Sequence, residues 1–190
     1  MKKNCYFIRH GYAMHNKLFW DIDRRAYTDF RDTNLLYEGY EQCKDLRNSW
    51  KNLKNVELVC VSPCVRTLDT SLFIFKNHNI NFIAKDFLIE YPLGGDEICN
   101  QRKNISDLTY LYPQIDFSEI KDDILPWSEE IESHESLNAR IGQMKKWIKN
   151  RPETTIAIVS HSSFIGMFKD NKIGDEKNEL KHCFPYNIRV

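Results

Sequence analysis

The chain has 190 residues, 42% of them hydrophobic and 28% charged, a composition that suits one globular unit with a sizeable core. Lysine plus arginine and aspartate plus glutamate both number 27, so the zero net charge gives no electrostatic case for a nucleic-acid or membrane partner. No apolar run could span a bilayer, and Met1–Asn4 lacks the apolar core of a signal peptide, so we expect a cytoplasmic location.

The six cysteines are scattered through the predicted strands and helices. Without a secretory signal, we expect them to be reduced thiols. Cys60 and Cys64 are near neighbours, but no second cysteine pair and no paired histidines at zinc spacing accompany them. The sequence therefore predicts no metal site and no cofactor.

The first predicted element is a buried strand that ends in Arg9-His10-Gly11. The three preceding residues, Tyr6-Phe7-Ile8, are apolar and favour β-structure. A strand that stops at this tripeptide places a cation and an imidazole at the edge of a sheet, where α/β proteins build their pockets. Glycine lets the backbone turn sharply and lets a ligand come close.

The next segment, Tyr12–Thr33, has poor periodicity and is expected to form a loop with one helical turn beside the strand end. Tyr12 and Trp20 in this segment either line the mouth of a pocket or pack against the core. Apolar residues then recur at helical spacing, which predicts an amphipathic helix over Tyr37–Leu53.

The second predicted strand, Val56–Val61, is continuously apolar, which is typical of a central parallel strand. It runs directly into a predicted helix that continues to Phe75. Ser62 is the expected N-cap of this helix and Pro63 suits its first turn.

The rest of the chain continues to alternate between strands and helices. The predicted elements are a strand over Asn81–Ala84, a loop over Tyr91–Arg102, a helix over Ile105–Leu111, irregular chain over Pro113–Pro126, a helix over Ser133–Lys149, a strand over Thr154–Ser160, a short helix over Phe164–Phe168 and an edge strand within His182–Val190. We see no repeat or linker, so residues 1–190 are expected to form a single α/β domain. Its expected fold is a three-layer sandwich, with helices on both faces of a mostly parallel sheet.

Polar residues follow four of these strands. The first strand ends in Arg9 and His10, the second leads to Arg66, the third leads to Glu90, and the most apolar strand ends in His161. Because parallel strands end at one edge of a sheet, these five side chains should meet there. Guanidinium groups bind phosphate, a neutral imidazole can attack phosphorus, and a carboxylic acid can protonate a leaving oxygen. The set predicts a phosphoryl-transfer site.

The same residues carry a family resemblance that covers nearly the whole chain. Its motifs are Arg9-His10-Gly11, Asn16, Gly39 and Gln42, Ser62-Pro63 with Arg66-Thr67, Glu90 and Val159-Ser160-His161. In these the chain resembles the histidine phosphatase superfamily, in the branch that includes cofactor-dependent phosphoglycerate mutases. The segment from Cys99 to Phe117 further resembles the phosphoglycerate mutase-like proteins of plants and fungi, which are mostly predicted phosphatases.

The resemblance implies a role for each matched residue. His10 would be the phosphorylated nucleophile and Glu90 the proton donor. Arg9, Arg66 and His161 would hold the phosphoryl group. For the substrate, the implied contacts are Asn16 on the phosphate side, the basic pair Arg102 and Lys103, and Ser162, which stands where many relatives have glycine.

The expected activity is hydrolysis of a small phosphomonoester through a phosphohistidine, without a metal. A mutase of phosphoglycerate type is the first alternative, but Tyr91-Pro92 follows Glu90 where true mutases have Arg-His. A non-catalytic phosphate-binding module is the second alternative. The sequence identifies neither the substrate, whose specificity lies in the Tyr12–Thr33 and Tyr91–Phe117 segments, nor the oligomeric state.

Several residues near these motifs have a competing interpretation. Asp86, Asp96 or Glu97 could replace Glu90 as the proton donor. Arg140, on the predicted helix over Ser133–Lys149, is expected to be an ion-pairing residue. The remaining histidines are expected at the surface or in local hydrogen bonds rather than in catalysis; they are His15, His78, His134 and His182.

Overall fold

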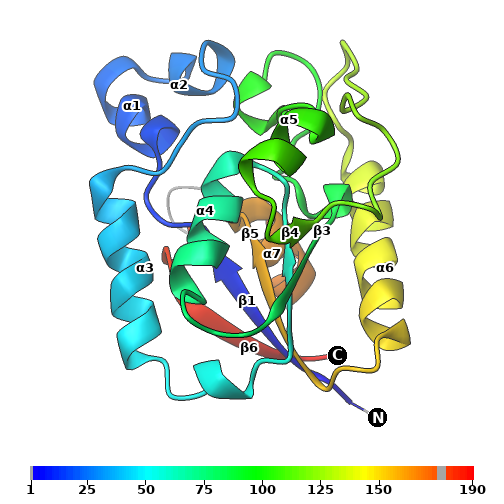
Figure 1. The fold of residues 1–190 in the computed structure, drawn as a ribbon. Helices are drawn as coiled ribbons and strands as arrows, with labels where there is room; N and C mark the ends of the chain where they lie inside the picture. Colours follow the sequence, from blue (N-terminus) through cyan, green and yellow to red (C-terminus); the bar gives the residue numbers. More distant parts are fainter. Residues whose placement is uncertain (1, 175–178) are drawn as a thin grey trace.

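The alternation of strands and helices predicted from the sequence is confirmed in the computed structural model, which describes residues 2–174 and 179–190 (Figure 1). The strands are β1 (Asn4–Arg9), β2 (Leu58–Val61), β3 (Asn81–Ala84), β4 (Ile115–Asp116), β5 (Thr155–Ser160) and β6 (Pro185–Arg189). The α-helices are α1 (Met14–Ile22), α2 (Arg25–Thr28), α3 (Tyr37–Ser49), α4 (Val65–Ile74), α5 (Ile105–Leu111), α6 (His134–Asn150) and α7 (Ser162–Asp170). Short 3-10 helices cover Leu53–Asn55, Asp86–Leu88 and Ile98–Asn100.

The strands form one sheet in the order β4-β3-β2-β5-β1-β6. Every pairing is parallel except that of β6, which runs antiparallel to β1 at the edge. The parallel strands therefore end at the same edge of the sheet, and Figure 1 shows α1, α2 and α5 beyond that edge. The predicted edge strand at the end of the chain is confirmed.

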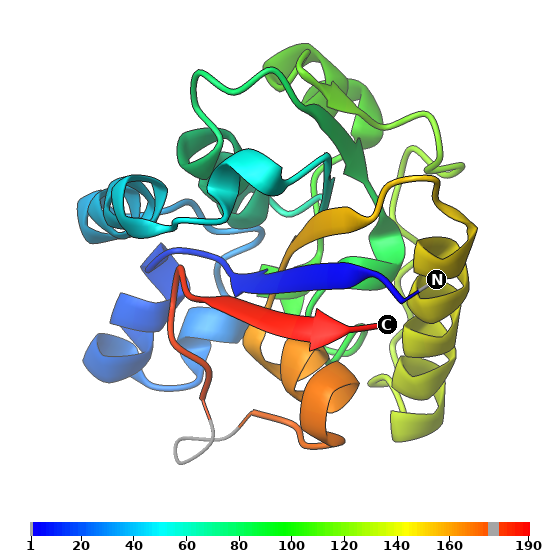
Figure 2. The same cartoon turned by 90° about the horizontal axis from the view of Figure 1, so that it is seen from below.

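Two apolar cores cover the two faces of the sheet. Along β1, Tyr6 and Ile8 face the core that includes residues of α3 and α4, whereas Cys5 and Phe7 face the core that includes residues of α6 and α7. Because both faces are covered, the central strands are apolar at consecutive positions. Figure 2 shows α3 on one side of the sheet and α6 on the other, which confirms the three-layer architecture.

The segment Tyr12–Thr33 contains more helix than the predicted loop with one helical turn, because α1 and α2 occupy much of it. Helix α1 turns polar side chains inward: His15 and Asn16 are its buried residues. The apolar period by which a helix is recognised is therefore missing from this stretch.

The prediction that Ser62 caps the next helix is also wrong. Helix α4 begins at Val65, and the backbone N–H of Val65 donates instead to Oδ1 of Asp32 at 2.9 Å. A carboxylate brought from elsewhere in the chain thus satisfies a free N–H at this helix start. By contrast, Ser133 caps α6 with its own side chain, since its Oγ accepts from the N–H of Ser136 at 3.2 Å.

No helix among residues 2–174 and 179–190 has both the length and the apolar composition needed to cross a bilayer.

The chain that follows β1 lies directly against α3, with two glycines at the contact. A Cβ on Gly39 would lie 2.3 Å from the carbonyl oxygen of Tyr12, and a Cβ on Gly11 would lie 2.7 Å from that of Gly39. In both cases the obstacle is backbone, which cannot move aside as a side chain can. This contact places the turn after β1, and with it His10, against α3.

We predict that Gly39→Ala lowers the free energy of unfolding by about 1–3 kcal/mol, because the new methyl group overpacks this contact. The matched control is Gly142→Ala on α6, where a Cβ would meet nothing within 4 Å. There the higher helix propensity of alanine should stabilise the protein by up to about 1 kcal/mol. Urea unfolding of both variants measures the difference, and equal stability of the two would contradict the prediction.

Candidate active site

The ends of the parallel strands open onto a cavity of about 460 Å³. Arg9 and His10 at the end of β1, Arg66 in the first turn of α4, and Glu90 after β3 all line it. His161, which follows β5, lies directly behind this lining, with its ring centroid 5.2 Å from that of His10. The structure therefore brings together the five side chains that the sequence predicts to be catalytic.

His10 is buried, with 2% of its surface exposed. Its Nδ1 lies 2.8 Å from the carbonyl oxygen of Gly11. A carbonyl only accepts hydrogen bonds, so Nδ1 carries the proton and Nε2 keeps its lone pair. Burial, together with the nearby charge of Arg66, holds the pKa of His10 well below its usual range. The ring is therefore neutral at physiological pH and presents Nε2 as a nucleophile.

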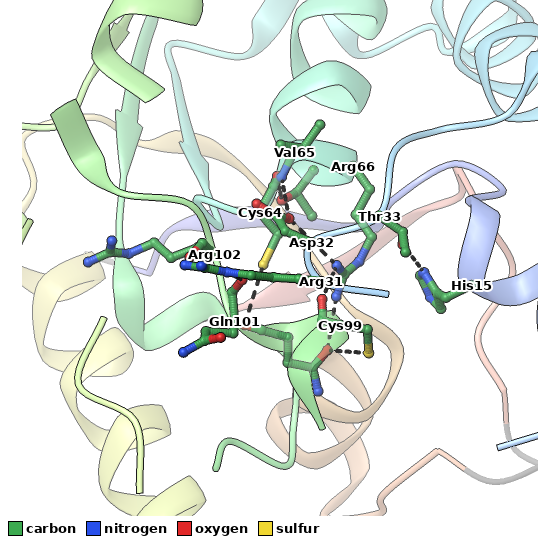
Figure 3. A network of polar contacts seen from close by, with 12 residues as sticks. His15, Arg31, Asp32, Thr33, Cys64, Val65, Arg66, Cys99, Gln101 and Arg102 are labelled. Atoms are coloured by element: carbon green, nitrogen blue, oxygen red, sulfur yellow. Dashed lines mark hydrogen bonds and ion pairs between the residues drawn. The ribbon is translucent and has the colours of Figure 1, made fainter. Parts of the chain in front are cut away.

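Arg66 is held rigidly at the other wall of the cavity. Its two terminal nitrogens donate to the carbonyl oxygen of Cys99 at 2.8 Å and to Oδ1 of Asn100 at 3.0 Å. Asp32 lies 4.0 Å away and provides a buried counter-charge (Figure 3). The guanidinium is thus fixed by partners on two loops before any ligand arrives.

Three side chains of the site retain unsatisfied hydrogen-bonding capacity. Within the part of the chain that the structure describes, the buried side-chain nitrogen and oxygen atoms without a hydrogen-bond partner are Nε of Arg9, Nε of Arg66 and Nδ1 of His161. Buried polar groups in proteins are nearly always paired, so unpaired ones indicate a ligand-binding role. Two guanidinium N–H groups and an imidazole nitrogen beside His10 form a site for an anion with several oxygens.

Ser62 is a hydrogen-bond partner of His161. Its Oγ lies 2.8 Å from Nε2 of His161. When the hydroxyl donates to Nε2, the proton of the neutral imidazole is on Nδ1, the unpaired nitrogen. Burial, reinforced by Arg66, keeps the pKa of His161 well below its usual range, so this ring is neutral as well. His161 can then donate to an anion without being charged.

Glu90 accepts three backbone hydrogen bonds around the start of α7. The donors are the N–H groups of Tyr91 at 2.8 Å, Ser163 at 3.1 Å and Phe164 at 3.0 Å. Burial nevertheless raises the pKa of Glu90, against the opposing effect of these donors. Glu90 therefore sits in the cavity with a raised pKa, as a proton donor requires.

The competing carboxylates differ in position. Asp86 binds Arg102, and neither it nor Asp96 lines the cavity. Glu97 does line it, is buried, and pairs with Arg24 at 2.6 Å. Glu97 is therefore the remaining alternative to Glu90.

Two of the four predicted substrate contacts line the cavity. Asn16 does so, and its Oδ1 accepts from the N–H of Ala13 at 3.0 Å. Because that oxygen is engaged, the amide keeps its Nδ2 donors for other partners. Ser162 also lines the cavity, and its Oγ accepts from the N–H of Leu180 at 3.0 Å.

Arg102 and Lys103 do not line the cavity, so the structure does not bring this predicted pair to the site. Arg102 is fully buried, and its guanidinium makes five hydrogen bonds. They go to both oxygens of Asp86 and to the carbonyl oxygens of Lys103, Asp122 and Asp123. All five N–H groups are used, which leaves none for a substrate. Arg102 ties together the loops beside α5.

Two histidines that sequence reasoning set aside lie beside His10. The rings of His15 and His182 are each 5.5 Å from that of His10, and both residues line the cavity. His15 is buried and hydrogen-bonds Oγ1 of Thr33 at 2.6 Å, so of its two expected settings, the surface or a hydrogen bond, the structure shows the second. One sequence feature could have pointed to His15. It lies four residues before Phe19, which puts both side chains on the same face of α1. His182 Nδ1 donates to the carbonyl of His10 at 2.6 Å, the local hydrogen bond that was expected.

No group of three or more histidine, cysteine, aspartate or glutamate side chains able to hold a metal occurs in residues 2–174 and 179–190. The expected ion pair of Arg140 is confirmed, because it binds Glu132 at 2.6 Å, away from the cavity.

Glu179 is an unpredicted member of the site, and its carboxylate pairs with Arg9 at the cavity wall. A phosphate bound to Arg9 would face this negative charge. We predict that Glu179→Gln tightens binding of inorganic phosphate roughly 3–10-fold, because the amide keeps the shape of the side chain and removes its charge. Isothermal titration calorimetry measures the change.

The control for that experiment is Glu153→Gln. Glu153 pairs with Arg151 at 2.7 Å and does not line the cavity. Its substitution should leave phosphate binding unchanged. Equal affinities of wild type and Glu179→Gln would show that the carboxylate does not oppose the anion.

Comparison with known proteins connects this site to one family. A sequence model of the histidine phosphatase superfamily (branch 1) matches residues 5–186. A phosphoglycerate mutase-like protein of Arabidopsis thaliana is 32% identical over 217 residues, which cover 94% of this chain and 79% of that protein.

Solved structures share the fold at much lower identity. The alpha-ribazole phosphatase of Shigella flexneri superposes with a TM-score of 0.61 at 17% identity, covering 95% of this chain and 87% of that one. The phosphoglycerate mutase of Bacillus anthracis superposes with a TM-score of 0.61 at 15% identity, covering all of this chain and 88% of that one. The same fold thus occurs in a phosphatase and in a mutase.

Proposed function

Since this chain belongs to the histidine phosphatase superfamily, we propose that it hydrolyses a phosphomonoester through a phosphohistidine on His10, without a metal. The observation that carries this proposal is the trio of unpaired buried nitrogens on Arg9, Arg66 and His161 beside the neutral ring of His10. Such donors match the oxygens of a phosphoryl group and stabilise the charge that it carries in the transition state.

In the first step, Nε2 of His10 attacks phosphorus. The N–P bond forms as the ester O–P bond breaks, and the carboxylic acid of Glu90 gives its proton to the leaving oxygen. The alcohol departs, and Glu90 is left as a carboxylate. Arg9, Arg66 and His161 hold the three non-bridging oxygens throughout.

In the second step, water attacks the phosphohistidine. The Glu90 carboxylate takes one proton from the water as its oxygen bonds to phosphorus. The N–P bond breaks, the lone pair returns to Nε2 of His10, and inorganic phosphate leaves. Glu90 and His10 then have their starting protonation states.

A mutase must also hold the charged remainder of phosphoglycerate. Besides Arg9 and Arg66, the described residues that line the cavity include one more arginine, Arg24. It already forms ion pairs with Asp96 and Glu97. The cavity therefore supports hydrolysis better than isomerisation. Assay with a bisphosphoglycerate primer tests the alternative directly, and interconversion of phosphoglycerates would establish it.

We predict that His10→Ala lowers kcat/KM for 4-nitrophenyl phosphate by at least about 10³-fold, because the nucleophile is lost. Wild-type protein incubated with a ³²P-labelled substrate should acquire an acid-labile, alkali-stable label that the variant lacks. The control is His78→Ala, an exposed histidine between α4 and β3 that does not line the cavity, which should retain full activity.

Activity of the His10→Ala protein would refute the assignment of the nucleophile. Vanadate binding without hydrolysis of any phosphomonoester by the wild type would instead support the non-catalytic phosphate-binding module.

We predict a bell-shaped pH profile. His10 must be neutral, and its lowered pKa moves the acid limb below pH 6.5, the ordinary histidine value. Glu90 must be protonated, and its raised pKa moves the alkaline limb above pH 4.5. For an alkyl phosphate, whose leaving oxygen needs a proton, Glu90→Gln should lower kcat/KM by roughly 10²–10⁴-fold.

The ratio of wild-type to Glu90→Gln kcat/KM, taken at each pH, cancels the titration of the substrate. This ratio should fall as the pH rises through the pKa of Glu90. The comparison variant is Glu97→Gln, which should keep the alkaline limb. If Glu97→Gln abolishes that limb and Glu90→Gln retains it, Glu97 is the acid.

A further inference from the structure

The phosphate-binding end occupies only part of the cavity, and aromatic rings line much of the remainder. These are the side chains of Tyr12, Phe19, Trp20, Tyr27 and Tyr91. Since a phosphate group needs charged and polar donors, this wall is placed to contact the other half of the ester.

Three of these rings, with His15, form a continuous row that leads to His10. The centroid of Trp20 lies 5.7 Å from that of Phe19, which lies 5.6 Å from Tyr27. Tyr27 lies 5.8 Å from His15, and His15 lies 5.5 Å from His10. These spacings are those of stacked or edge-to-face aromatic pairs. A ring bound in the cavity would extend this row.

Trp20 ends the row at the open side of the cavity. It lines the cavity, yet 77% of its surface is exposed. Indole presents a large apolar face, so a ligand ring placed against it removes water from both surfaces. Its position on α1 fixes the indole on regular secondary structure.

The charges around this wall disfavour an anionic substrate tail. Arg24 is the arginine among the described lining residues outside the phosphate end. It forms ion pairs with Asp96 and Glu97. Glu97 and Glu179 contribute negative charge to the same cavity. A carboxylate or second phosphate on the alcohol would meet these anions and, among the described lining residues, would compete with Asp96 and Glu97 for Arg24.

Resting on the proposed phosphatase function, we propose that the substrate is a phosphomonoester whose alcohol carries an uncharged planar ring. The ring packs along Tyr27, Phe19 and Trp20 while the phosphoryl group lies between Arg9 and Arg66. The ring can belong to an aryl alcohol or to the base of a nucleoside monophosphate, and the assay below separates these sources.

The first experiment compares benzyl phosphate with cyclohexylmethyl phosphate. Their leaving alcohols are both primary and of similar size, so the difference reports the planar ring rather than the ease of O–P cleavage. We expect kcat/KM to be about 5–10-fold higher for benzyl phosphate, the range that one aromatic contact supplies. Equal values, or a preference for 3-phosphoglycerate over benzyl phosphate, would overturn the proposal.

A second pair identifies the source of the ring. The kcat/KM for adenosine 5′-monophosphate is compared with that for ribose 5-phosphate, which lacks the base. A higher value for the nucleotide supports a nucleoside substrate. A ring preference confined to benzyl phosphate supports an aryl alcohol.

The variant Trp20→Ala tests the mouth of the row. It should raise KM for benzyl phosphate about 5–10-fold and leave KM for ethyl phosphate unchanged. The matched control is Tyr110→Ala on α5, which removes an equally exposed aromatic side chain that does not line the cavity. Equal effects of Trp20→Ala on both substrates would show that the indole does not contact the ring.

Binding without turnover separates this proposal from the catalytic one. Benzylphosphonate should bind wild-type protein more tightly than methylphosphonate. Its binding should also quench the tryptophan fluorescence of the wild type, and this quenching should be absent in Trp20→Ala. If the wild-type protein hydrolyses neither ester but shows this binding preference, the proposed phosphatase function is refuted and the ring site is supported. A protein that hydrolyses benzyl and cyclohexylmethyl phosphates equally well remains a phosphatase and lacks the ring site.

Discussion

The desolvation of Arg9 and Arg66 is the constraint on which the rest of the site depends. Both guanidinium groups are almost completely buried. A buried cation is costly unless it is paired and hydrogen-bonded. Arg66 meets this need with the carbonyl of Cys99 and the side chain of Asn100, and Arg9 does so with groups near the end of the chain. In each of them Nε has no hydrogen-bond partner among the described residues, and this remaining capacity faces the proposed anion site.

The same constraint explains the state of the histidines. Burial of the rings, reinforced by the positive charge of Arg66 and Arg9, holds the pKa values of His10, His15 and His161 well below the usual range. A protonated imidazole at His10 could not attack phosphorus. In the proposed mechanism, the arginines therefore bind the anion and also help to keep His10 neutral.

Sequence reasoning located the groups that follow β-strands, because strand periodicity and the parallel arrangement together predict where such side chains meet. Arg9, His10 and His161 were placed in this way. It failed for Arg102, since a basic residue in a loop has the same local pattern whether it binds a substrate or buries itself against carbonyl oxygens. It also missed His15, since α1 buries polar rather than apolar residues, and Glu179, which is far from Arg9 in the chain.

The first and last parts of the chain complete the site together. The carbonyl oxygens of Arg9 and His10 accept hydrogen bonds from the N–H of Cys183 and from Nδ1 of His182, and β6 pairs with β1. During synthesis, residues 4–10 leave the ribosome long before residues 180–190 exist. Since contacts between such distant segments form slowly, the pocket around His10 stays unfinished until residues 180–190 have been made and have packed against β1.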